Sequence, residues 1–216
     1  MQNKLYFETM IVPGIPDDQF IRLEHVPMTK EEVRVISLCK LKPSENGIVY
    51  DIGAGTGSVS VECARLCPEG KVYALEQKES ACQAISLNKE KFGVDNLEII
   101  HATAPDGLKD LPSPTHVFIG GTGGHLREIY DALVEKMSED PDVSGIRVIL
   151  TAVTLETISE MTDLAKEKQL EVEATQISVS KAKKLGDYHL MMGQNPVTIF
   201  SFTIGENETG ERNSGR

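Results

Sequence analysis

The chain has 216 residues, of which 40% are hydrophobic and 25% are charged, and its net charge is −11 at pH 7. These values are typical of a globular domain, and the acidic balance argues against a nucleic-acid partner, because such partners are bound largely by Lys and Arg. No apolar run approaches the roughly 20 residues that cross a bilayer, and no secretory signal is visible, which favours a cytoplasmic protein without a membrane partner.

The ends of the chain differ from its middle. Residues 1–14 have no clear period and are expected to form a flexible arm, and residues 205–216 lack apolar side chains and are expected to be a disordered tail. A single domain is predicted over residues 15–204. Within it, short apolar runs predict strands at 47–52, 71–76, 97–102, 116–120, 146–153, 171–180 and 196–204, and amphipathic stretches predict helices at 30–41, 58–66, 80–92, 126–137 and 155–168.

Alternating strands and helices predict an α/β fold with a mostly parallel sheet and helices on both faces. The last two predicted strands are joined only by a polar segment, Lys181 to Asn195, which we expect to be a loop. A connection without a crossover helix favours an antiparallel pair, so the last of the seven strands should be antiparallel. The four cysteines fall on helical segments without zinc-ligand spacing, and we predict neither a metal site nor a disulfide.

The first predicted strand ends in the segment Asp51-Ile52-Gly53-Ala54-Gly55-Thr56-Gly57, and a predicted helix follows. Glycines at alternate positions permit a tight turn and a close approach of a ligand to the backbone. The ligand would then face backbone amides and the positive end of a helix dipole, which suits a carboxylate or a phosphate.

The Gly-x-Gly-x-Gly spacing, with a serine at position 58 where the dinucleotide pattern has its third glycine, distinguishes this loop from a dinucleotide site, as does Asp51 at the strand end. Asp51 would repel a pyrophosphate but would suit the ammonium group of a methionine moiety. Glu76 ends the second strand, where it could accept hydrogen bonds from both hydroxyls of a ribose. Together they favour S-adenosylmethionine as cofactor. The alternative is an ordinary strand-to-helix turn with surface carboxylates.

Two further segments follow the third and fourth strands. Thr103 and Ala104 lie where enzymes with this cofactor contact the adenine; many have Asp in place of Thr103, so a backbone contact near Ala104 is expected instead. The fourth strand leads into Gly120-Gly121-Thr122-Gly123-Gly124, which lacks the Asn/Asp-Pro-Pro-aromatic motif of enzymes that methylate amino groups. Backbone amides from Gly121 to Gly124 are expected to bind anionic groups of the substrate.

Segments 15–20, 28–34, 120–124, 151–157 and 195–197 together resemble the decarboxylating precorrin methyltransferases of cobalamin biosynthesis. The resemblance runs over about residues 15–204. It implies a Rossmann-like class I S-adenosylmethionine-dependent methyltransferase with seven strands and a reversed last strand. The implied reaction is methylation of carbon 15 of a precorrin or cobalt-precorrin, with decarboxylation of the carbon-12 acetate, by a homotetramer. The implied cofactor contacts are Thr29, Gly53, Ala54, Gly55, Thr56, Gly57, Glu76 and Ala104, whereas Thr103 departs from the more frequent Asp.

The implied substrate is a tetrapyrrole with several carboxylates, so its site should supply cations. Lys181 and Lys183 of the predicted polar loop are candidates, although solvated surface lysines are the alternative reading. Decarboxylation needs an electron sink, and an acid that protonates the macrocycle would help. His125, Glu156 and His189 are the candidates, each with an alternative role as a helix cap or surface group.

Two rival functions share parts of this pattern. A tRNA or protein methyltransferase would use the same cofactor half, and it would show a basic face or would methylate tRNA or a peptide. A cofactor-binding subunit without catalysis would also keep the glycine loop, because binding does not prove turnover.

Overall fold

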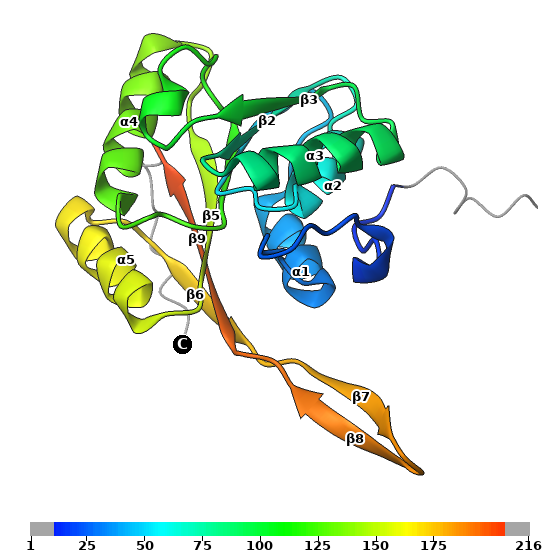
Figure 1. Ribbon diagram of the computed structural model, residues 1–216. Coiled ribbons are helices and arrows are strands. Elements are labelled where there is room, and N and C mark those ends of the chain that lie inside the picture. Colours follow the sequence, from blue (N-terminus) through cyan, green and yellow to red (C-terminus); the bar gives the residue numbers. More distant parts are fainter. Residues whose placement is uncertain (1–10, 206–216) are drawn as a thin grey trace, which may run out of the picture.

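A computed structural model describes residues 11–205, which form a seven-stranded sheet with helices on both faces (Figure 1). Residues 1–10 of the predicted arm (1–14) and residues 206–216 of the predicted tail (205–216) lie outside the described residues. The helices are α1 (Glu31–Leu41), α2 (Ser58–Leu66), α3 (Glu79–Phe92), α4 (Leu126–Glu139) and α5 (Leu155–Lys168), with short 3-10 helices η2 (Asp17–Gln19) and η3 (Asp106–Leu108). The strands are β1 (Ile48–Ile52), β2 (Lys71–Glu76), β3 (Leu97–His101), β4 (His116–Ile119), β5 (Ile146–Ala152), β6 (Glu173–Ile177), β7 (Ser180–Leu185), β8 (Tyr188–Gly193) and β9 (Val197–Ile204).

The predicted α/β arrangement is confirmed. The sheet order is β3-β2-β1-β4-β5-β9-β6, and the first five of these strands pair in parallel. The last strand, β9, lies antiparallel between β5 and β6. All the predicted helices are present with small shifts at their ends.

Side chains of the central strands face one of two cores in alternation, because successive residues of a strand point to opposite faces. Tyr50 and Ile52 of β1 pack in the core under α4 and α5, with Leu126 and Met161. Val49 packs in the core on the side of α1 and α2. Figure 1 shows the same separation, with α4 and α5 on one side of the sheet and α1, α2 and α3 on the other. The alternation also directs Asp51 towards α2, which matters for the site.

The predicted polar loop at Lys181–Asn195 is wrong, since most of it is the antiparallel hairpin β7–β8. Leu185 pairs with Tyr188 across a turn of Gly186 and Asp187, and Gly186 has a φ of 62°. A glycine-aspartate pair between extended segments is a signal for a two-residue hairpin turn, and glycine adopts positive φ without strain. The frequent lysines give this segment the composition of a polar loop, so the hairpin was not predicted. The hairpin extends away from the body of the molecule (Figure 1).

Candidate active site

The predicted cofactor residues meet at the carboxyl ends of β1, β2 and β4. Strand β1 has β2 on one side and β4 on the other, so the chain order reverses there, which is where ligands bind in open α/β sheets. The loops after β1 and β4 touch: a Cβ added to Gly53 would lie 3.0 Å from the backbone nitrogen and oxygen of Gly121. Two adjoining cavities open at this point.

The first cavity, of about 280 Å³, is lined by Pro27, Ile52, Gly53, Leu75–Lys78, Ala102–Ala104, Gly120–Gly123 and His125. The second, of about 400 Å³, is lined by Pro27–Lys30, Val33, Gly53–Gly55, Gly120, Thr151, Val153, Gln194, Asn195 and Val197. Pro27, Gly53 and Gly120 belong to both cavities. A ligand that bridges the two would therefore cross between the β1 and β4 loops.

The glycine loop does not offer its amides to a ligand, contrary to the expectation from sequence. The amides of Gly53 and Ala54 both donate to the Leu75 carbonyl, at 3.0 and 3.1 Å. The other three amides of the loop also donate within the protein: Gly55 to Glu76 Oε2 (2.9 Å), Thr56 to the Pro27 carbonyl (3.1 Å) and Gly57 to the Ala54 carbonyl (2.8 Å). The loop therefore shapes the cavity floor, while its hydrogen bonds hold the loop itself in place.

Gly55 is required for a reason that the sequence did not reveal. Its φ is 56°, and an added Cβ would lie 2.4 Å from the Pro27 carbonyl oxygen. A side chain at this position would collide with the protein backbone rather than with a ligand. The segment of residues 14–30, here called the N-terminal strap, is thus packed directly on the loop.

A buried ion cluster fastens the N-terminal strap. The side chain of Arg34 is 0% exposed and pairs with Glu62, which is 2% exposed, and with Asp17. Its guanidinium also donates to the carbonyls of Ile15 and Thr29. Arg34 therefore binds both ends of the strap, and the intervening Pro27 and Met28 are held against the cavities.

Glu76 combines two tasks. Its carboxylate accepts hydrogen bonds from the amides of Gly55 (2.9 Å) and Lys78 (3.0 Å), and it lines the first cavity. Each carboxylate oxygen has a further lone pair, so the group can still accept from a ligand's hydroxyls. The predicted neighbours Thr103 and Ala104 line the same cavity.

Asp51 lies beneath the loop and lines neither cavity. Its carboxylate is fully buried against α2, where Ser60 Oγ donates to Oδ2, and Oδ1 has no hydrogen-bond partner within residues 11–205. Burial, aided by the nearby charge of Glu76 and opposed by the Ser60 bonds, raises the pKa of Asp51 to about 7. A carboxylate that is buried with so few hydrogen bonds lowers the free energy of unfolding when it is ionised.

Asp51→Asn is therefore expected to change the pH dependence of stability. The pKa of Asp51 rises from 3.8 to about 7 on folding, so the unfolded chain releases this proton first as pH rises. The free energy of unfolding of the wild type should fall relative to the variant by about 2–3 kcal/mol between pH 5 and pH 8. Urea unfolding of both proteins at the two pH values measures this difference. Parallel pH profiles would contradict the assignment.

Some of the remaining predicted site residues line one of the two cavities, and others line neither. Thr29 lines the second cavity, and Gly121, Thr122, Gly123 and His125 line the first. Gly124 follows this loop, and its amide donates to Thr122 Oγ1 at 3.1 Å. Glu156, Lys181, Lys183 and His189 line neither cavity. Glu156 is exposed on α5, and the other three are exposed on the hairpin.

Sequence reasoning missed several residues that line the cavities. Gln77 and Lys78 follow Glu76 directly, so their place after the second strand could have identified them. Pro27 and Met28, in contrast, reach the cavities through contacts between the strap and a loop far along the chain. No local pattern marks such contacts.

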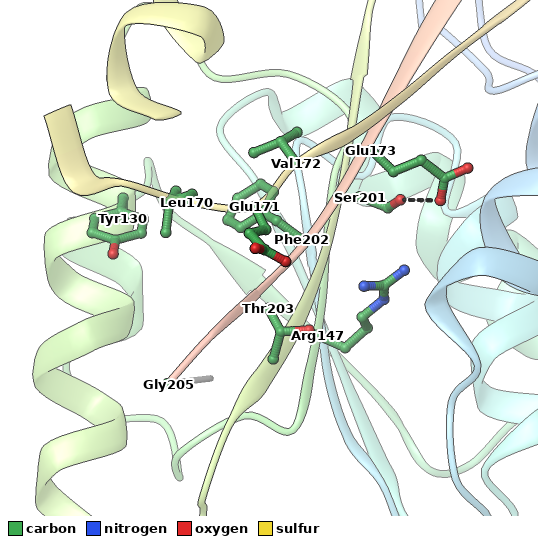
Figure 2. A pocket seen from close by; sticks show the side chains of 10 residues that line it. All are labelled: Tyr130, Arg147, Leu170, Glu171, Val172, Glu173, Ser201, Phe202, Thr203 and Gly205. Carbon is green, nitrogen blue, oxygen red and sulfur yellow. Dashed lines mark hydrogen bonds between the residues drawn. The ribbon is translucent and has the colours of Figure 1, made fainter. Parts of the chain in front are cut away.

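A further cavity, of about 420 Å³, lies at the other end of the strands, where β5 begins and β9 ends, and is lined by the residues drawn in Figure 2. Several polar groups in and beside this cavity are bonded to the protein itself. Ser201 Oγ donates to Glu173 Oε2 at 3.2 Å, Lys40 pairs with Glu173 Oε1 at 2.6 Å, and Arg147 Nε donates to the Lys40 carbonyl at 3.1 Å. Ligands of such sheets bind at the carboxyl ends of the parallel strands, so we place the active site there.

Within residues 11–205, no group of three or more His, Cys, Asp or Glu side chains is arranged to hold a metal ion. None of the helices in that part of the chain is long and apolar enough to span a membrane.

Comparison with known proteins gives consistent matches. The family model of the precorrin methyltransferase domain matches residues 23–204. A protein of Pyrobaculum calidifontis, named "probable cobalt-precorrin-6B C(15)-methyltransferase (decarboxylating)", is 42% identical over 191 residues, which cover 88% of this chain and 95% of that protein.

Two crystal structures are similar over most of their length. Precorrin-6y C5,15-methyltransferase of Geobacter metallireducens has a TM-score of 0.80 and 37% identity, with 89% of this chain and 98% of that chain covered. Precorrin 8w decarboxylase of Methanobacterium thermoautotrophicum has a TM-score of 0.79 and 31% identity, with 87% and 98% covered. The residues matched by the family model, 23–204, include every residue that lines the two cavities.

Proposed function

The chain belongs to the precorrin methyltransferase family, and we propose that it methylates carbon 15 of a precorrin or cobalt-precorrin and decarboxylates the carbon-12 acetate, in cobalamin biosynthesis. The observation that carries the proposal is the pair of adjoining cavities at the β1–β4 switch point. A methyl donor and a methyl acceptor must meet at one point, and two cavities that share Pro27, Gly53 and Gly120 provide such a junction.

The residues present fit S-adenosylmethionine, which supplies an activated methyl group when bound. Glu76 would accept from the ribose hydroxyls, and the backbone at Thr103 and Ala104 would contact the adenine in the first cavity. Thr29 would contact the methionine moiety where the second cavity borders the glycine loop. Asp51 would act through the loop, since its buried carboxylate, when ionised, favours an ammonium group nearby. The protein's main task is alignment of the two reactants.

Decarboxylation requires no methyl donor, and its demands are macrocycle binding and protonation. Of the three acid candidates, His125 is the one that lines a cavity of the site. It is the N-cap residue of α4 and is exposed, so its ring can reach a ligand and exchange protons with solvent. We propose His125 as the proton donor to the macrocycle. Glu156 and His189 are not included in this proposal.

The test is direct. The purified protein is incubated with cobalt-precorrin-6B and S-adenosylmethionine, and mass spectrometry reads the gain of a methyl group and the loss of carbon dioxide separately. Both changes are expected in one product. Methylation of tRNA or of a peptide, with neither change in the macrocycle, would instead favour a rival function, and cofactor binding without any turnover would indicate a non-catalytic subunit.

We further propose that the chain forms a homotetramer through the β7–β8 hairpin. Residues directly opposite each other in the pairing share a face, so Lys183 and Lys181 lie on the same face as Leu190 and Met192. Leu185, Tyr188, Leu190 and Met192 form an apolar stripe on that face, mainly along β8. Their exposed fractions range from 46% to 76%. A two-stranded hairpin is marginally stable by itself, and a stripe of this kind is typical of a protein interface.

Leu190→Asp combined with Met192→Asp is expected to lower the oligomeric state, because the two carboxylates would be buried unpaired at the interface. Light scattering coupled to size-exclusion chromatography measures the molar mass. Leu87→Asp, which changes an exposed leucine of α3 in the same way, is the control. A tetramer that persists in the double variant would exclude the hairpin as the interface.

A further inference from the structure

The second cavity is built from two walls and a floor. Met28, Thr29 and Lys30 of the N-terminal strap form one wall, and the ends of β5 and β9 with the segment before β9 form the other: Thr151, Val153, Gln194, Asn195 and Val197. The floor is the glycine loop with Gly120. None of the residues of the second wall is among those that the sequence assigns to the cofactor. A ligand against that wall would face the methyl donor across the junction.

The wall formed by β5 and its continuation presents exposed apolar side chains. Val153 is 65% exposed, and Leu155, two residues further, is 80% exposed. Met28 and Val197 line the same cavity and are half-buried. Exposed apolar side chains beside a cavity are a common feature of binding sites, because a ligand removes them from water. The ligand of this wall should therefore present an apolar face.

The rim carries one cation and two amides. Lys30 is the only charged residue among the described residues that line the cavity. Its ammonium lies 3.7 Å from Asp17 Oδ2, a long contact that leaves its other donors available. The nearby acids are paired elsewhere as well: Asp17 Oδ1 accepts from Arg34 at 3.2 Å, and Glu32 pairs with Lys181 at 2.6 Å. Gln194 and Asn195 add amide donors on the opposite side.

We propose that this cavity binds one edge of the tetrapyrrole substrate, with Val153 and Met28 against the macrocycle and Lys30 paired with one of its side-chain carboxylates. The assignment rests on the proposed function, because it needs a substrate that is apolar across its ring and anionic at its edge. The cation that pairs with the substrate is then Lys30 of the N-terminal strap, in place of Lys181 and Lys183 of the hairpin. Lys30 then selects for substrates with a carboxylate at that edge.

The same arrangement explains why the strap is anchored so firmly. Arg34 binds the Thr29 carbonyl, and the Pro27 carbonyl accepts from Thr56, so Met28 and Lys30 are fixed relative to the glycine loop. Fixed side chains lose little conformational entropy when a ligand binds. The strap thereby aligns the macrocycle with the donor through the same contacts that shape the cofactor side.

The test compares Lys30→Gln and Val153→Asp with matched controls. Both target residues are partly or largely exposed, so the fold should tolerate both changes. Binding of cobalt-precorrin-6B is followed by the visible absorption of the macrocycle in the presence of S-adenosylhomocysteine. Binding of S-adenosylhomocysteine alone is measured by calorimetry. Lys166→Gln, an exposed lysine of α5, and Leu87→Asp, an exposed leucine of α3, are the charge-matched and size-matched controls.

Each target variant is expected to raise the Kd for the macrocycle about tenfold, the size of one lost charged hydrogen bond or of a carboxylate placed against an apolar contact. The Kd for S-adenosylhomocysteine should stay within about twofold, and the controls should match the wild type. Unchanged macrocycle binding in both variants would overturn the assignment while the proposed function stands. A Lys30→Gln effect on S-adenosylhomocysteine alone would assign Lys30 to the cofactor and overturn its role here. A wild type that does not bind the macrocycle would instead reject the proposed function.

Discussion

Arg34→Met is expected to lower the free energy of unfolding by about 3–5 kcal/mol, the usual cost of leaving one member of a buried ion pair without its partner. Glu62 is 2% exposed and would keep only its hydrogen bonds from the amides of Gly14 and Ile15. The Ile15 carbonyl would also lose its donor, and the Thr29 carbonyl would keep only Ser58 Oγ at 3.4 Å. Urea unfolding followed by circular dichroism measures the change.

The double variant Arg34→Met with Glu62→Gln separates two consequences of this change. Removing the orphaned charge should restore much of the lost stability, because the penalty belongs mainly to the unpaired carboxylate. The N-terminal strap would remain without its anchor, so affinity for S-adenosylhomocysteine should stay below that of the wild type. A single variant within about 1 kcal/mol of the wild type would show that Arg34 does not hold the strap.

Glu76→Ala is expected to raise the Kd for S-adenosylhomocysteine by roughly 10- to 150-fold, the equivalent of about 1.5–3 kcal/mol for hydrogen bonds to a charged group. We expect a value near the upper end, because the carboxylate also accepts from Gly55 and Lys78. Its loss would loosen the glycine loop as well as remove the ribose contact. Glu76→Gln keeps one acceptor oxygen and should be intermediate. An unchanged Kd in Glu76→Ala would remove Glu76 from the cofactor site.

The same variant tests whether the two proposed activities are independent. Methyl gain should be strongly reduced in Glu76→Ala, whereas loss of carbon dioxide should persist, because decarboxylation does not use the methyl donor. His125→Ala should reduce decarboxylation more than methylation if His125 protonates the macrocycle. Equal loss of both activities in Glu76→Ala would indicate an obligatory order or a shared site. An already methylated substrate distinguishes these cases, since recovered decarboxylation supports an order of steps.

The class of fold, and the order of the helices and of the strands of the main sheet, could be predicted from the sequence because they depend on local patterns. A run such as Ile48–Ile52 is apolar because both faces of a central parallel strand are covered, and α2 follows the glycine loop directly. Glu76 could be assigned to the cavity for the same reason, since the ends of adjacent parallel strands lie side by side. Such inferences need only the neighbouring residues along the chain and the rule that ligands of open α/β sheets bind at the carboxyl ends of the strands.

Only the tertiary structure decided what each loop atom does. The Pro27 carbonyl, far from the glycine loop in sequence, accepts from Thr56 and occupies the space beside Gly55. The pleat of β1 turns Asp51 under α2, so a residue predicted to face the ligand is buried behind the loop. Lys181 and Lys183 lie on a projecting hairpin, while Lys30 lines a cavity. These outcomes depend on contacts between distant segments, and their geometry is fixed by packing and by the need to satisfy buried polar groups, neither of which leaves a periodic signal in the sequence.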